Sequence, residues 1–159
     1  MKQQQGFTLI ELVAVIILLG ILAVTALPRF IDLQSDAKAG VLKGVKASLQ
    51  GAATQIYAKS LIQGIESSAT GTVDVSGTTV EVAYGYPQAY TAVAANETIK
   101  DLVTIDSSDS PLLFEVLSAE SAAIKVGYGD LSTGNCYITY TEPSAAGNDP
   151  LIVITDTGC

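Results

Sequence analysis

The sequence predicts an α+β fold in which one long N-terminal helix packs against an antiparallel β-sheet. Three observations predict this arrangement. Apolar residues are nearly continuous from Phe7 to Leu27, they then recur with helical spacing to about Ile62, and the rest of the chain carries short runs that alternate as strands do. With 159 residues, the chain has room for one domain of ordinary size and the segment that leads into it.

The first half of the predicted helix is long enough to cross a membrane. Of the 21 residues from Phe7 to Leu27, 17 are apolar and only Glu11 is charged. At about 1.5 Å per residue, this helix spans roughly the 30 Å of a bilayer's hydrocarbon core. A signal peptide has a shorter apolar core and a small-residue cleavage site, and no good site of that kind precedes Pro28. Lys2 should stay in the cytoplasm by the positive-inside rule, which places the rest of the chain outside.

Glu11 is the residue that a generic membrane anchor does not explain. A carboxylate at the centre of a span costs ~2.5–3.5 kcal/mol, less near the interface, and is usually functional or paired. It could lie hydrated near the interface. If it is instead neutralised, its cation must come from a terminus or another molecule, because no Lys or Arg lies between Glu11 and Pro28.

The second half of the predicted helix is amphipathic. Its apolar stripe has spacings of three and four residues and consists of Leu42, Val45, Leu49, Ala52 and Ile56. Gly20 and Pro28 are the weak points of the helix, and a proline in a helix interior costs about 3 kcal/mol, so we expect a kink there. We expect Gly64 to end the helix.

The remaining residues predict a β-rich head. Two alternating runs, 72–75 and 79–82, flank Ser76-Gly77 and indicate a hairpin. The stretch from Pro87 to Val103 has helical character, with Pro87 as a first-turn residue and a second start near Thr98. Four strand-like runs follow, at 112–117, 122–128, 136–141 and 151–155. An antiparallel sheet on the amphipathic half of the helix is the arrangement that this order favours.

Composition excludes several classes of function. The net charge is −8 and the isoelectric point is near 4.2, which argues against nucleic-acid binding. The chain has no histidine, so imidazole bases, His-dependent nucleophiles and His-based metal sites are excluded. Residues 1–60 carry six basic and three acidic side chains, whereas residues 61–159 carry two and thirteen. No motif supports catalysis, and we expect no enzyme activity, no cofactor and no metal.

Three smaller features have a functional and a structural interpretation. Cys136 and Cys159 are the only cysteines, and they lie in a head predicted to be exported, which favours a disulfide. The alternative is a free reactive thiol, which lacks a basic activating neighbour nearby in the sequence. Asp106-Ser107-Ser108-Asp109-Ser110 has oxygen ligands that suit calcium, although a solvated acidic turn is the simpler interpretation. Asn96-Glu97-Thr98 fits the N-glycosylation pattern, which occurs often by chance.

The N-terminus resembles a known signal. Gly6-Phe7-Thr8-Leu9-Ile10-Glu11-Leu12-Val13, followed by an apolar span, is similar to the class III prepilin signal of type IV pilins. The resemblance implies cleavage after Gly6 by a membrane prepilin peptidase, methylation of the new N-terminal residue Phe7, and pairing of Glu11 with the terminal amine of a neighbouring subunit. It also implies that the helix around Gly20 and Pro28 can unwind in a filament core.

Further segments resemble the mannose-sensitive haemagglutinin branch of pilins. They are residues 26–30, 33–34, 36–37, 51–53, 84–87, 136–141 and 158–159. The resemblance implies a leader at 1–6, a membrane or filament-core helix half at 7–28, an amphipathic half at 29–63 and a head at 64–159 with a Cys136–Cys159 loop. It implies a subunit that lies in the inner membrane before assembly and in an extracellular pilus afterwards. The implied partners are other copies of the chain, the prepilin peptidase, the assembly platform and motor, and a surface or glycan receptor.

Two related interpretations stay open at this point. A pseudopilin of a type II secretion system shares the N-terminal signal, although major pseudopilins generally lack the C-terminal disulfide loop. A minor pilin is the second alternative. A membrane-tethered hydrolase or binding module would need a catalytic constellation or a pocket signature, and the sequence shows neither.

Overall fold

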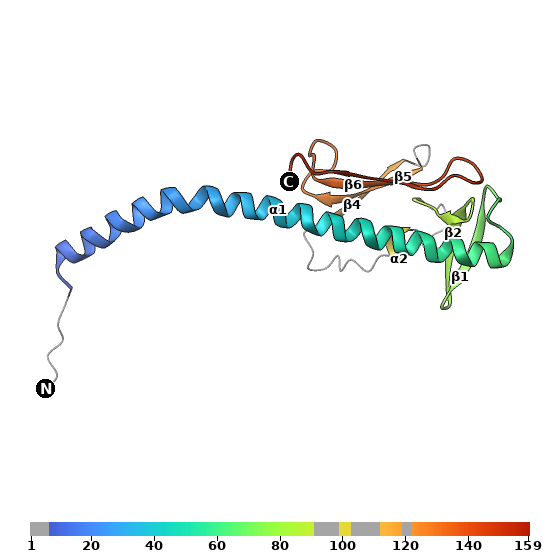
Figure 1. The fold of residues 1–159 in the computed structure, drawn as a ribbon, viewed down its shortest axis with the longest axis horizontal. Coiled ribbons are helices and arrows are strands. Elements are labelled where there is room, and N and C mark those ends of the chain that lie inside the picture. The colour runs from blue at the N-terminus through green and yellow to red at the C-terminus, as the bar shows by residue number, and fades with distance from the viewer. Residues whose placement is uncertain (1–6, 91–98, 103–111, 119–121) are drawn as a thin grey trace, which may run out of the picture. The chain divides into compact units, whose positions relative to one another are not determined.

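The computed structural model describes residues 7–90, 99–102, 112–118 and 122–159 (Figure 1). The chain divides into two compact units, Met1–Ala37 and Lys38–Cys159. The elements in chain order are α1 (Leu9–Gln63), β1 (Gly71–Val75), β2 (Thr78–Ala83), β3 (Tyr86–Pro87), α2 (Ile99–Leu102), β4 (Leu112–Ser118), β5 (Ala123–Tyr128), β6 (Tyr137–Thr141) and β7 (Leu151–Thr155). The predicted α+β class is confirmed, with two antiparallel sheets rather than one.

Within the Lys38–Cys159 unit, the amphipathic part of α1 supplies one side of the hydrophobic core. Leu42, Val45 and Leu49 are buried there together with side chains of the larger sheet, including Ile124 and Ile138. The predicted stripe is therefore correct with one adjustment: Ala53 is buried, while Ala52 is only partly buried at the edge of the cluster. Burial of this stripe against the sheet is what makes the second half of the helix stable, because helix propensity alone is weak.

A glycine ends α1, as the sequence predicts. Gly64 has a φ of +68°, a conformation that favours glycine. The Gly64 N–H bonds to the Leu61 carbonyl at 3.2 Å, and the Ile65 N–H bonds to the Ser60 carbonyl at 3.0 Å. This pair of bonds is a Schellman motif, which satisfies carbonyls that the end of the helix would leave unpaired. Ile65 then packs against the smaller of two core clusters.

The smaller sheet has the order β1-β2-β3. The predicted hairpin is confirmed: Val75 pairs with Thr78 across a two-residue turn, Ser76-Gly77, in which both residues have positive φ. The expectation that Pro87 begins a helix is wrong. A second turn of the same kind, Tyr84-Gly85, directs Tyr86 and Pro87 back along β2 as a third strand. Of the helical stretch predicted up to Val103, residues 91–98 and 103 lie outside the described residues, and α2 occupies 99–102.

The larger sheet has the order β4-β5-β6-β7, and all its pairings are antiparallel. Its four strands match the four predicted runs to within one residue at each end. The backbone of β6 leaves no room for a side chain at Gly127 of β5, because a Cβ atom there would be 2.6 Å from the Cα of Tyr137. This close approach explains why β5 contains a glycine despite its low strand propensity.

Two buried hydrogen bonds hold β3 and its turn against the rest of the core. The Ser60 hydroxyl of α1 donates to the Gly85 carbonyl at 2.9 Å, and the Tyr140 hydroxyl of β6 donates to the Pro87 carbonyl at 2.7 Å. Both side chains are fully buried. These bonds satisfy carbonyls that would otherwise be costly to bury, and they fix β3 between the helix and the larger sheet.

Candidate functional site

The N-terminal end of α1 is closed by a reciprocal cap. The Thr8 hydroxyl and the Thr8 N–H both donate to Oε2 of Glu11, at 2.6 and 2.9 Å, and the Glu11 N–H donates to the Thr8 hydroxyl at 3.4 Å. Thr-x-x-Glu with these contacts is a capping box. Oε1 of Glu11 has no hydrogen bond to any described residue, so it can accept a donor from outside the chain while Oε2 keeps the cap.

The apolar half of α1 has no core of its own. Leu9–Ala26 is long and apolar enough to cross a membrane, by length and composition, and none of it is buried within the described chain. Its large apolar side chains from Leu9 to Val24 are 38–79% exposed. A surface of this size is not stable in water and requires a partner, which is either lipid or other protein.

The structure describes three of the four other predicted site residues in this segment, namely Phe7, Gly20 and Pro28. Gly6 lies outside the described residues, and Phe7 precedes the helix with an almost fully exposed side chain. Gly20 and Pro28 both fall inside α1, which is assigned as helix throughout. A Cβ atom at Gly20 would meet nothing within 4 Å, so the chain itself gives no packing reason for that glycine. The kink at these two positions stays a prediction.

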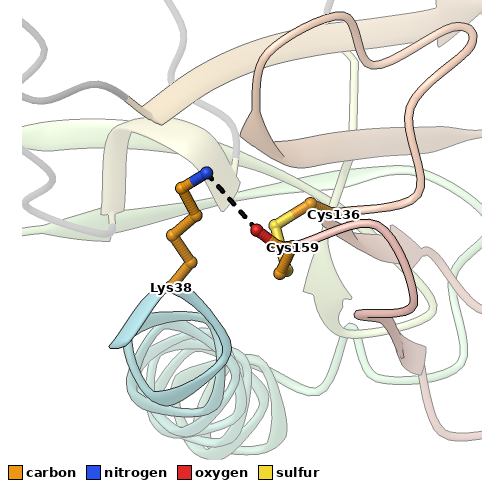
Figure 2. Close-up of a disulfide and its surroundings, with 3 residues drawn as sticks. All are labelled: Lys38, Cys136 and Cys159. Atoms are coloured by element: carbon orange, nitrogen blue, oxygen red, sulfur yellow. Dashed lines mark hydrogen bonds between the residues drawn. A yellow bond between two sulfur atoms is a disulfide. The ribbon is translucent and has the colours of Figure 1, made fainter. Parts of the chain in front are cut away.

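The two cysteines form a disulfide, with a Cα–Cα distance of 4.7 Å (Figure 2). Cys136 is buried in the main core, next to β6, and Cys159 follows β7, so the bond closes a loop that contains both strands. Figure 2 shows the side chain of Lys38 of α1 pointing toward Cys159, where its Nζ donates to the Cys159 carbonyl at 3.4 Å. The same ammonium lies 5.7 Å from the centre of the Tyr128 ring.

A groove that the sequence analysis did not predict lies between α1 and the edge strand β7. Its volume is about 390 Å³, and its lining residues are Gln50, Ala53, Thr54, Tyr86, Asp149, Pro150 and Ile152. We call it the α1–β7 groove. The Tyr86 hydroxyl donates to Oδ1 of Asp149 at 2.8 Å, and the Tyr86 ring stacks on Tyr57 with centroids 4.4 Å apart. Burial and the bond to Asp149 raise the pKa of Tyr86 to about 12, so the phenol stays protonated.

A partly buried carboxylate, that of Glu142, anchors the segment that follows β3. Oε2 of Glu142 accepts the Ala89 N–H at 2.8 Å. Partial burial raises the pKa of Glu142 above its ordinary value, and the bond from Ala89 opposes that shift. Among the described residues, no group of three or more Cys, Asp or Glu side chains is arranged to hold a metal ion. The calcium and glycosylation candidates at 106–110 and 96–98 lie outside the described residues.

Comparison with known proteins identifies the N-terminal segment. Residues 1–27 match the prokaryotic N-terminal methylation motif. The motif covers both the Gly6-Phe7 junction and the capped start of α1. Its match supports a type IV pilin-like prepilin.

Two curated relatives are similar to part of the chain. The type IV narrow pilus major component PilA5 of Thermus thermophilus is 41% identical over 59 residues, which are 37% of this chain and 47% of that protein. The type II secretion system core protein G of Pseudomonas aeruginosa is 46% identical over 43 residues, 27% of this chain and 30% of that protein. The matches thus span less than half of either relative. No solved structure is significantly similar to the chain.

Proposed function

We propose that the chain is a pilin, a structural subunit that polymerises through its N-terminal helices into an extracellular type IV pilus. The observation that carries the proposal is the exposed apolar helix with one carboxylate near its start, within a methylation motif. In the membrane, lipid covers the apolar surface. In the filament, the same surfaces of neighbouring copies cover one another, and the heads form the outside.

In this proposal, cleavage after Gly6 exposes the amine of Phe7, one residue before the capping box. An incoming amine needs an acceptor with negative charge, and Oε1 of Glu11 supplies one without breaking the bonds of Thr8 to Oε2. The apolar span contains no cation to neutralise the carboxylate, so the amine of another copy is the natural partner. Such a pair fixes the axial position of one subunit against the next.

Attachment to surfaces is the finer part of the proposal. It depends on the resemblance of several segments to the mannose-sensitive haemagglutinin pilins, and it assigns the disulfide loop and the acidic head to the outer face of the filament. A pseudopilin is the second candidate, because core protein G of a type II secretion system is one of the similar proteins. The two candidates differ in product: a pilin forms long surface filaments, and a pseudopilin forms a short periplasmic one.

Filaments sheared from cells that produce the chain provide the test. The intact mass of their main protein should correspond to a chain that begins at Phe7 and carries one methyl group. Glu11→Ala and Glu11→Gln should be processed and inserted but should yield few filaments. Val13→Ala is the matched control, because it trims an apolar side chain of the same helix and keeps the charge. An N-terminus at Met1, or wild-type filament yield from Glu11→Ala, would contradict the proposal.

A further inference from the structure

The α1–β7 groove contains more hydrogen-bond acceptors than donors. The hydrogen of the Tyr86 hydroxyl is committed to Asp149, and that of the Thr54 hydroxyl is committed to the Gln50 carbonyl at 2.8 Å. Both hydroxyl oxygens therefore offer only lone pairs to a ligand. Asp149 adds a carboxylate, and the amide of Gln50 is the one side-chain donor that remains among the lining residues.

The rest of the groove is suited to a short alkyl chain. Ala53, Pro150 and Ile152 contribute apolar atoms to its lining. The Tyr86 ring is held in place by its stacking on Tyr57, with an angle of 11° between the two rings. A negative charge, acceptor lone pairs and an aromatic ring are the features that bind a positively charged donor group.

We propose that the α1–β7 groove binds a primary ammonium group, and that in the assembled protein this group is a lysine of a second copy of the chain. Residues 38–63 of α1 carry four lysines and no carboxylate. Lys38 and Lys59 donate to carbonyls of their own copy, at Cys159 and Asp74. Lys43 and Lys46 have no hydrogen bond or ion pair with any described residue, which leaves their ammonium groups for a neighbour.

The binding site is tested on the full-length protein in detergent with n-butylammonium chloride, a mimic of the lysine side chain. Titration should shift the NMR amide signals of Gln50, Thr54 and Ile152. n-Butanol, which has the same length and no charge, should not shift them. Asp149→Asn keeps the acceptor for Tyr86 and removes the charge, so it should weaken butylammonium binding at least about tenfold. Asp156→Asn, a charge loss outside the groove, is the matched control and should leave binding unchanged.

Two outcomes would overturn the binding site. One is an equal response to butanol and butylammonium, which requires no variant and so does not depend on the folding of Asp149→Asn. The other is an affinity of Asp149→Asn within twofold of wild type, with unchanged signals for the core amides of Ile124 and Ile138.

The second copy is tested on filaments and therefore depends on the proposed function. Filaments assembled from mixed ¹⁴N- and ¹⁵N-labelled copies are treated with a carbodiimide, which joins a carboxylate and an amine that are in contact. Hybrid-mass peptides that link Asp149 to Lys43 or Lys46 would support the second copy as the source. Butylammonium binding without such hybrid peptides would overturn the assignment to a second copy and would indicate that the groove binds a soluble amine. Absence of filaments would count against the proposed function alone, because the titration needs none.

Discussion

Removal of the Cys136–Cys159 disulfide should lower the free energy of unfolding of the head by several kcal/mol. Cys136 and Cys159 are 23 residues apart in sequence, and in the chain-entropy model the closure of a loop of that length contributes about 3.5 kcal/mol to the free energy of unfolding. For a unit of this size, that loss lowers the melting temperature by roughly 10–15 °C. The edge strand β7 lies inside the loop, so its pairing with β6 should be lost first.

The assay uses full-length protein in detergent, with near-ultraviolet circular dichroism as the readout. The chain has seven tyrosines and no tryptophan, and every tyrosine lies at or after residue 57, so this signal reports the Lys38–Cys159 unit and not the apolar part of α1. Cys136→Ala/Cys159→Ala should melt at the lower temperature with or without reductant, and wild type should fall to a similar value only when reduced. A difference below about 3 °C, or thiols that react with an alkylating reagent without reduction, would refute the reasoning.

Three further changes test the packing and electrostatics of the head, each by thermal melting of the full-length protein. Gly127→Ala should lower the free energy of unfolding by about 3 kcal/mol or more, because the new Cβ meets the backbone of Tyr137. Gly129→Ala should lower it by only about 1 kcal/mol, because the residue has a positive φ but no close neighbour. Equal effects would contradict the close approach of β6 to Gly127. Tyr140→Phe should cost about 1–3 kcal/mol by leaving the buried carbonyl of β3 without a donor, and a neutral effect would show that the bond is dispensable. Because the pKa of Glu142 is raised in the folded state, the contribution of this carboxyl to stability should fall as pH rises above about 4.5. Glu142→Gln should flatten that part of the plot of stability against pH. An unchanged plot would mean that this carboxyl titrates in the folded protein as it does in the unfolded chain.

Local patterns in the sequence predict most of the elements. The stripe from Leu42 to Ile56, the Ser76-Gly77 turn and the four later strands all follow from periodicity and turn chemistry, which report on residues close together in the chain. The helix expectation fails at Pro87 because the role of this residue depends on a turn that ends two residues earlier and on a bond from Tyr140, 53 residues away. A proline is equally compatible with a helix start and an edge strand, so composition alone could not decide.

The candidate sites differ in the same way: a site made of neighbouring residues can be predicted from the sequence, and a site made of distant residues cannot. The methylation motif is contiguous, so sequence was sufficient to single out Phe7 and Glu11. The capping contact between Thr8 and Glu11 follows a known local pattern and could have been predicted from Thr-x-x-Glu. The α1–β7 groove could not, because Tyr86 and Asp149 are 63 residues apart and meet only once β3 and β7 are both in place.

Under the proposed function, Glu11 contributes to the free-energy difference between the subunit in the membrane and the subunit in the filament. In the bilayer, the carboxylate lies at the start of a span with no cation, which carries a cost that increases toward the membrane centre. The cap of Thr8 offsets part of that cost by satisfying Oε2, and it leaves Oε1 unsatisfied. Pairing with the amine of another copy removes the remaining cost, whereas apolar contacts between helices replace equally apolar contacts with lipid and gain little. The carboxylate therefore makes the assembled state more favourable than the membrane state, while the exposed apolar side chains are compatible with both.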